Sequence, residues 1–273
     1  KFMFSLIKSG MATAMHELSV VSNNIANANS NGFKKTLVAF SELGDRFGSE
    51  QVDSSKVGQG ASLEASRRSD GQGAIVETDR KTDLALIGNG MFILKKNPTS
   101  VTPTFSRNGS FSLDNLGFLR APNDAFVMGA PLVDGAFGPI PTDLDGLQPI
   151  QIPLKREDAP MSELKILGNG SIAAAYGTEV SYPVSTITLG LFSNNSGLKE
   201  LGGGSYSQTD KSGVVSFGAP SDLGYASLRS GGLEASNVNI TDELTSMIKA
   251  QQQFNGAARL MQTNSEMVEK LTR

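Results

Sequence analysis

The stretch SNNIANANSNGFKK, residues 22–35, follows an apolar helical pattern and decides where the first helix ends. Five of the nine residues from 23 to 31 are asparagine. Asparagine is unfavourable inside a helix and tolerates the left-handed backbone conformation. We therefore expect the helix to end in a turn between Asn29 and Gly32, with Gly32 at the position that needs a positive φ.

The residues before this stretch place apolar side chains at alternating spacings of three and four. The stripe consists of Phe4, Ile7, Met11, Ala14, Leu18, Val21 and Ile25. This spacing is typical of a coiled-coil seam. An amphipathic helix that packs on its own domain is the alternative interpretation.

A second stripe with the same spacing runs to the other end of the chain. Asn237 and Asn239 are candidate N-caps, and Asp242 and Glu243 suit the first turn. The stripe consists of Leu244, Met247, Gln251, Phe254, Ala258, Met261, Ser265 and Val268. Isolated helices of this length are marginal in water, so we expect the two helices to pair and to become fully ordered only in an assembly.

The middle of the chain has a strand-like pattern. It is rich in turns, among them Asn108-Gly109 and Asn169-Gly170, and the whole chain has 30 glycines. The sequence therefore predicts an α+β fold with a β-rich middle between two pairing helices. The expected parts are an N-terminal helix over 1–35, an extended linker over 36–74, a β-rich domain over 75–209, a return linker over 210–235, and a C-terminal helix over 236–273.

The composition leaves little chemistry. The chain has no cysteine, one histidine and a net charge of −3, which excludes disulfides and thiolate metal sites and gives no basic surface for nucleic acid. His16 lies off the apolar stripe, and we expect it to face solvent or an interface rather than to act in catalysis. Carboxylates such as Asp143 and Asp145 do not have the spacing of a calcium loop. We expect no catalytic, cofactor or metal site and no small-molecule substrate.

No apolar run approaches the roughly 20 residues that cross a membrane. The first fifteen residues are interrupted by Lys8, Ser9 and Gly10 and lack a small-residue cleavage site. They therefore do not have the pattern of a secretory signal peptide.

Four further stretches occur in a recognisable order. They are SVVSNNIANANSNGFKK at 19–35, TDLALIGNGMF at 82–92, TFSRNGSFSLDNLGFL at 104–119 and GGLEASNVNITDELTSMIKAQQQF at 231–254. In these motifs, and in LGLFSNNSGLKELGGGSYSQTDKSG at 189–213, the chain resembles the bacterial flagellar axial proteins, the rod and hook proteins of the basal body. The resemblance spans nearly the whole chain.

This resemblance implies an inner coiled-coil domain made by the terminal helices and an outer β-rich domain. It implies assembly into a hollow helical filament of the basal body that transmits torque and forms the export channel. Implied partners are copies of the same chain, other rod and hook proteins, surrounding basal-body rings and the flagellar type III export apparatus. Family members leave the cell without a cleaved signal peptide.

Within this family the sequence favours a rod protein. Hook proteins usually carry an additional outer domain, whereas this chain has room for one sizeable β body between about Ile75 and Thr209. A short hook protein stays as the alternative, and proximal and distal rod are not distinguished. A wall-hydrolysing enzyme would need a further domain with convergent carboxylates. An adhesin or export chaperone would not need the RNGSF and LEASNVNI segments together.

The asparagines suggest a specific role in assembly. Asn23, Asn24 and Asn27 can hydrogen-bond to neighbouring subunits or to the C-terminal helix and so fix the register, as a buried asparagine does in a coiled coil. The alternative is that they only cap and solvate a helix end. The expected assembly interface consists of Phe4, Ile7, Met11, Leu18, Val21, Asn23, Asn24, Ile25, Asn27, Gly32, Phe33, Leu244, Met247, Gln251, Phe254, Met261 and Val268.

Overall fold

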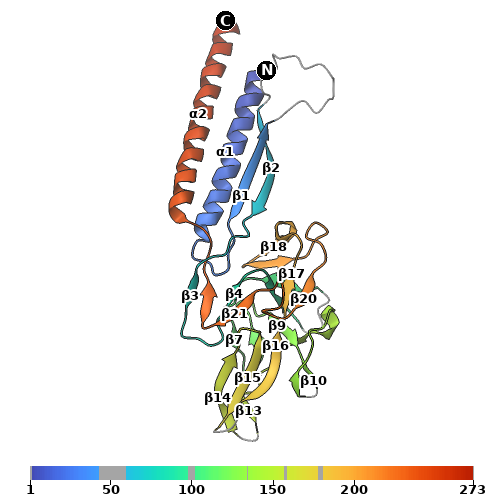
Figure 1. Ribbon diagram of the computed structural model, residues 1–273. Helices are drawn as coiled ribbons and strands as arrows, with labels where there is room; N and C mark the ends of the chain where they lie inside the picture. Colours follow the sequence, from blue (N-terminus) through green and yellow to red (C-terminus); the bar gives the residue numbers. More distant parts are fainter. Residues whose placement is uncertain are drawn as a thin grey trace. The chain divides into compact units, whose positions relative to one another are not determined.

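The computed structural model describes residues 2–42, 60–97, 102–133, 135–156, 159–177 and 181–272 (Figure 1). The chain is α+β, with a helix near each end, α1 at Phe2–Ala26 and α2 at Ile240–Thr272, and strands between them. It divides into two compact units. The helical unit comprises Lys1–Ala28, Lys35–Ser69 and Val238–Arg273, and the β unit comprises Asn29–Lys34 and Asp70–Asn237.

In the helical unit, α1 and α2 lie side by side, and a β-hairpin packs along α1 (Figure 1). The hairpin consists of β1 at Thr36–Glu42 and β2 at Ala61–Arg68, paired antiparallel with a bulge between Ala39 and Phe40. The expected linker over 36–74 is therefore wrong for these strands. Their weakly apolar sequences gave no clear alternation, because only one side of a two-stranded sheet packs against α1. The rest of that expected linker, 43–59, lies outside the described residues.

Both helix ends follow local chemistry. Helix α1 ends at Ala26, and the backbone then turns, with the Ala28 amide donating to the Ile25 carbonyl. Gly32 has the predicted positive φ of 69°, but it lies beyond the end of the helix and does not cap it. Before α2, the Asn239 side chain accepts a hydrogen bond from the Thr241 amide at 3.1 Å, so the predicted N-cap at Asn239 is confirmed.

The β unit is built on a large antiparallel sheet. The order of its main path is β13 (Lys155–Arg156), β14 (Ala159–Ile166), β15 (Ser171–Tyr176), β16 (Tyr182–Ile187), β9 (Phe126–Ala130), β5 (Met91–Lys95), β6 (Thr104–Ser106), β19 (Ser205–Ser207) and β18 (Lys199–Gly202). Branches are formed by β7 (Ser112–Leu113), β8 (Leu119–Arg120), β12 (Gln148–Pro149), β17 (Leu189–Leu191) and β20 (Ser216–Gly218).

Three small two-stranded sheets complete the β unit. They pair β3 (Ile75–Glu77) with β22 (Gly232–Glu234), β4 (Leu84–Ile87) with β21 (Ser227–Ser230), and β10 (Leu132–Val133) with β11 (Ala136–Phe137). Two 3-10 turns lie at Leu144–Gly146 and Asn195–Gly197. Because β20, β21 and β22 pair with earlier strands, the expected return linker over 210–235 is wrong. These strands are only three or four residues long and rich in serine and glycine, so they carried little strand signal.

The core of the β unit is closed and apolar. Its largest fully buried side chains are Leu84, Leu86, Phe92, Ile93, Leu94, Phe105, Phe111, Leu119, Met128, Ile150, Ile152 and Tyr206. Phe92 and Phe111 meet edge to face, with ring centroids 4.9 Å apart. This packing gives the β unit a hydrophobic core of its own.

The two Asn-Gly turns have different outcomes. Asn169-Gly170 joins β14 to β15 in a hairpin, as predicted. Asn108-Gly109 does not join a hairpin, because β6 pairs with β5 and β19 while β7 pairs with β8. A Cβ on Gly109 would lie 1.8 Å from the Leu84 carbonyl oxygen, so glycine is needed here for close backbone approach.

Candidate assembly site

The α1 side of the helix seam follows the predicted stripe. Ile7, Ala14 and Val21 are buried. Met11, Leu18 and Ile25 are half-buried, whereas Phe4 is exposed. The stripe therefore faces the partner elements of its own unit over most of the length of α1.

The α2 side differs from the prediction in one of its two rows. Met247, Phe254 and Met261 are half-buried, but the other buried row is Glu243, Ala250, Ala257 and Asn264, one residue before the row that was expected. The residues expected there and found exposed are Leu244, Gln251 and Ser265; Ala258 is half-buried, and Val268 is exposed. Alanines at 250 and 257 allow close helix approach, and Glu243 is held by a polar partner, so hydrophobicity alone did not reveal this row.

That polar partner is Asn24, which is buried at the end of α1. Its Nδ2 donates to the Thr36 carbonyl oxygen at 2.9 Å and to Glu243 Oε2 at 3.1 Å. Its Oδ1 accepts from the Thr36 amide at 3.0 Å. One side chain thus joins α1, β1 and α2, and the predicted contact with the C-terminal helix is present at Asn24.

The neighbouring asparagines act locally. Asn27 Nδ2 donates to the Asn23 carbonyl at 3.0 Å, which fits the alternative that these residues cap the helix end. The side chain of Asn23 is exposed. His16 Nε2 lies 3.3 Å from Ser66 Oγ on β2, within the helical unit.

A buried ion cluster inside the β unit explains three of the sequence motifs. Glu234 Oε1 accepts from Lys34 Nζ at 2.5 Å and from the Gly73 amide at 3.0 Å, while Oε2 lies 3.0 Å from Arg107 Nε and 2.9 Å from its NH2. The Glu234 side chain is fully buried. Lys34 is 200 residues and Arg107 is 127 residues away from Glu234 in sequence, so the cluster joins distant segments.

The remaining donors of the cluster are also satisfied. Arg107 NH1 donates to the carbonyls of Gly88 and Gly90, both at 2.8 Å, and Lys34 Nζ donates to the Gly71 carbonyl at 2.9 Å. Burial lowers the pKa of the Lys34 amine, and its hydrogen bond to Glu234 opposes that effect. The sequence search did not find this cluster, because no local pattern pairs charges so far apart.

Gly32 and Phe33 belong to the same region and are buried inside the β unit. The Gly32 amide donates to the Glu234 carbonyl at 2.7 Å, and a Cβ on Gly32 would lie 2.7 Å from the backbone of Arg107. The Phe33 carbonyl accepts from the Asn237 amide at 3.3 Å. Both residues were expected at the assembly interface, and here they contribute to the internal packing of one chain.

The LDNLGFLR motif forms a tight turn. Asp114 Oδ1 accepts from the amides of Leu116 and Phe118 at 2.9 and 2.8 Å, and Oδ2 accepts from Arg120 Nε at 2.8 Å. The hydrogen bond from Arg120 is the main reason that the pKa of Asp114 lies below its ordinary value. Gly117 has a φ of 82° in the same turn.

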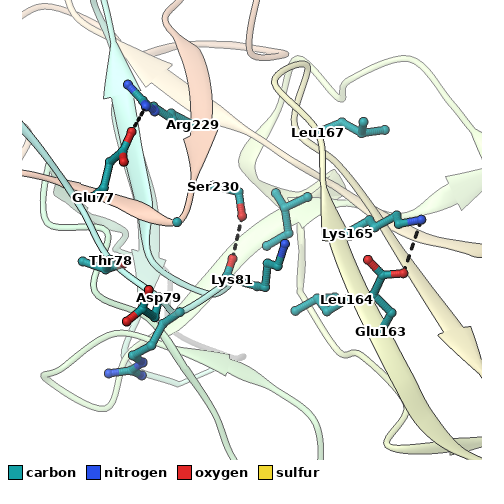
Figure 2. A pocket seen from close by; sticks show the side chains of 13 residues that line it. Glu77, Thr78, Asp79, Lys81, Glu163, Leu164, Lys165, Leu167, Arg229 and Ser230 are labelled. Atoms are coloured by element: carbon teal, nitrogen blue, oxygen red, sulfur yellow. Dashed lines mark hydrogen bonds and ion pairs between the residues drawn. The ribbon is translucent and has the colours of Figure 1, made fainter.

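The β unit also carries a polar groove of about 600 Å³ (Figure 2). Its walls are residues 77–81, 163–167 and 229–231. Glu163 and Lys165 form an ion pair at 3.3 Å on one wall, and Glu77 pairs with Arg229 on the other. Among the described residues there is no cluster of histidine, aspartate or glutamate suited to a metal ion. The groove therefore offers paired charges rather than a reactive centre.

Neither α1 nor α2, over the residues described, has an apolar stretch of the length that crossing a bilayer requires. Two family models match the ends of the chain: "Flagella basal body rod protein" over 8–34, and "Flagellar basal body rod FlgEFG protein C-terminal" over 229–273. The flagellar basal-body rod protein FlgG of Bacillus subtilis is 32% identical over 274 residues, covering 96% of this chain and 95% of that protein. This chain belongs to the flagellar basal-body rod protein family.

Other members of the flagellar rod family and the hook proteins are also similar. The rod protein FlgG of Agrobacterium fabrum is 28% identical and covers 96% of this chain. The hook protein FlgE of Caulobacter vibrioides is 33% identical over 150 residues, covering 53% of this chain and 25% of that protein. The matched ends contain Asn24, Lys34 and Glu234, so the rod-family signature coincides with the helix seam and the ion cluster. As a family member, the chain is a structural subunit of the flagellar axis in the basal body.

Proposed function

We propose that this chain is a rod subunit that polymerises through its helical unit into a hollow helical filament, which transmits torque and forms an export channel. The observation that carries the proposal is the match to the Bacillus subtilis rod protein along nearly the full length of both chains. The similarity to the hook protein covers only a quarter of that protein. The structural role leaves no part for catalysis, and the groove with its paired charges supports none.

The helical unit supplies the means of assembly. Its seam has rows of Glu243, Ala250, Ala257 and Asn264 alternating with Met247, Phe254 and Met261, a spacing suited to coiled-coil pairing. Two helices and a two-stranded hairpin make a thin unit with little interior. Copies that pack together would remove its remaining apolar surface from water, which favours polymer over monomer.

A short hook protein is the second candidate, and the 33% identity to the Caulobacter hook protein supports it. Partners in either case are further copies, other rod and hook proteins, basal-body rings and the flagellar export apparatus. Expression in flagellated cells that lack their own FlgG rod protein separates the two functions. A rod subunit restores a complete basal body, whereas a hook subunit does not.

The assembly test compares Asn24→Ala with Asn23→Ala in the full chain. Asn24 joins three elements of the helical unit, whereas the Asn23 side chain is exposed one residue away. Loss of the two Asn24 side-chain contacts leaves Glu243 without that partner and costs about 1–3 kcal/mol. We expect Asn24→Ala to impair polymerisation, measured by sedimentation and electron microscopy, with the β unit still folded.

Asn23→Ala should polymerise like the wild type. Equal polymerisation of both variants would remove the role that we assign to Asn24. A wild-type chain that forms no polymer under any condition would contradict assembly itself.

A further inference from the structure

Helix α2 exposes apolar side chains on both sides of the seam. On the first flank, Ile240, Leu244 and Ile248 have exposed fractions of 46%, 45% and 55%. Their spacing of four places them in one row over two turns of helix. Leu244 and Ile248 each follow a seam residue by one position, which is about 100° around the helix.

The second flank lies on the opposite side of the seam and further along α2. It consists of Leu260 and Met267, with exposed fractions of 62% and 50%. Each follows a seam residue, Ala257 or Asn264, by three positions. Three positions correspond to a rotation of about 60° in the opposite sense to that of the first flank.

Charged residues occupy the other half of each flank. Glu266 lies eighteen residues after Ile248, and Asp242 and Lys249 lie eighteen residues before Leu260 and Met267. Eighteen residues are five full turns, so these residues share the faces of their apolar counterparts. The first flank is therefore apolar near the start of α2 and charged near its end, and the second flank has the reverse order.

We propose that the first flank of one copy packs against the second flank of another copy, displaced along the helices by about 19–20 residues. This displacement puts Ile240 opposite Leu260 and Ile248 opposite Met267, with Leu244 between them. At 1.5 Å per residue, it corresponds to about 30 Å.

Charge explains why the copies are displaced. Without displacement, Ile248 would face Lys249 of the next copy, and Met267 would face Glu266. Burying such charges without partners is costly. With the displacement, Asp242, Lys249 and Glu266 lie outside the overlap, and only apolar side chains meet.

Two different flanks also give the right kind of symmetry. A two-fold dimer uses the same patch on both copies, whereas contacts between unlike patches continue into an open helical array. The inference rests on the proposed function, because it names the partner as a second copy of this chain in the polymer. Another flagellar axial protein is the alternative occupant of either flank.

The test uses disulfide formation, since the chain has no cysteine of its own. Full-length Ile248→Cys and Met267→Cys chains are mixed, polymerised and oxidised. We expect covalent dimers in this mixture and at least about tenfold fewer in either variant alone. A mixture of Ile248→Cys with Lys249→Cys is the control for packing without displacement, and it should give no dimers.

Sedimentation of each sample scores polymerisation separately. Absence of polymer in the wild type contradicts the proposed function and the flank pairing with it. Polymer without the Ile248–Met267 dimer, or with the Ile248–Lys249 dimer, contradicts the flank pairing alone. Polymer that forms only with another axial protein, and without Ile248–Met267 dimers, assigns the flanks to that protein and overturns our choice of partner.

A second pair of variants removes the dependence on cysteine chemistry. Leu260→Glu puts a charge on the second flank, whereas Gln262→Glu puts one on an exposed position two residues away. We expect Leu260→Glu to raise the concentration needed for polymerisation about tenfold and Gln262→Glu to change it less than about twofold. Equal effects of the two variants would contradict the proposal.

Discussion

In the β unit the side chain of Phe92 is fully buried, whereas in the helical unit Ile248 keeps 55% of its surface exposed. The contrast extends to charge. Glu234 is enclosed by two cations and a backbone amide in the β unit, while Glu243, the buried carboxylate of the helical unit, has an amide partner. One unit completes its interior within a single chain, and the other leaves apolar rows for further copies to cover.

The largest expected effect breaks the enclosed side of this comparison. Glu234→Ala leaves Lys34 and Arg107 buried without their counter-charge, which should lower the free energy of unfolding by about 3–5 kcal/mol. Urea denaturation of the full chain, followed by the signal of the β unit, measures this loss. Glu77→Ala removes a carboxylate from an exposed ion pair with Arg229 and serves as the control, with a loss of less than about 1 kcal/mol. Equal losses would show that burial of the cluster adds nothing.

A pair of glycine substitutions should have opposite signs in the two units. Gly32→Ala forces a side chain into a positive φ and onto the Arg107 backbone, and should cost about 1–3 kcal/mol. Gly10→Ala lies within α1 with no atom within 4 Å of the new Cβ, and should stabilise the helix by about 0.5–1 kcal/mol. Thermal unfolding of the two variants decides. A destabilising Gly10→Ala would contradict the open environment described for α1.

The smallest expected effect concerns acid. The pKa of Asp114 is lowered in the folded state, mainly by the hydrogen bond from Arg120, so its stabilisation is present above the ordinary pKa of 3.8 and is lost as pH falls through the folded-state pKa. In Asp114→Asn, stability should therefore fall less steeply below pH 4 than in the wild type. Urea midpoints measured across that range test this. Parallel curves for the two proteins would refute it.

Sequence patterns predicted the helices better than the contacts between them. The stripe on α1 was predicted well because Ile7, Ala14 and Val21 are apolar and buried. On α2 the pattern was ambiguous, since apolar side chains occur on the seam and on both flanks. The row that includes Glu243 and Ala250 gives no hydrophobic signal, so the predicted row was displaced by one residue.

Long-range contacts were beyond sequence reasoning for a different reason. Gly109 was interpreted as part of a hairpin turn, but its role depends on Leu84, which approaches it from another strand. Likewise, Lys34, Arg107 and Glu234 each look like solvated charges in their local sequence. Only the fold brings them together, which is why the cluster was not predicted while its motifs were recognised.

The most direct test of the central claim is hydrogen exchange of the full chain, compared between the monomer and the sedimented polymer. We expect the amides of β5 and β9 to be protected in both states, because the β unit has its own core. The amides of α1 and α2 should exchange much faster in the monomer and become protected in the polymer. Terminal helices that are as protected in a monodisperse monomer as β5 and β9 would contradict the claim that the helical unit depends on further copies.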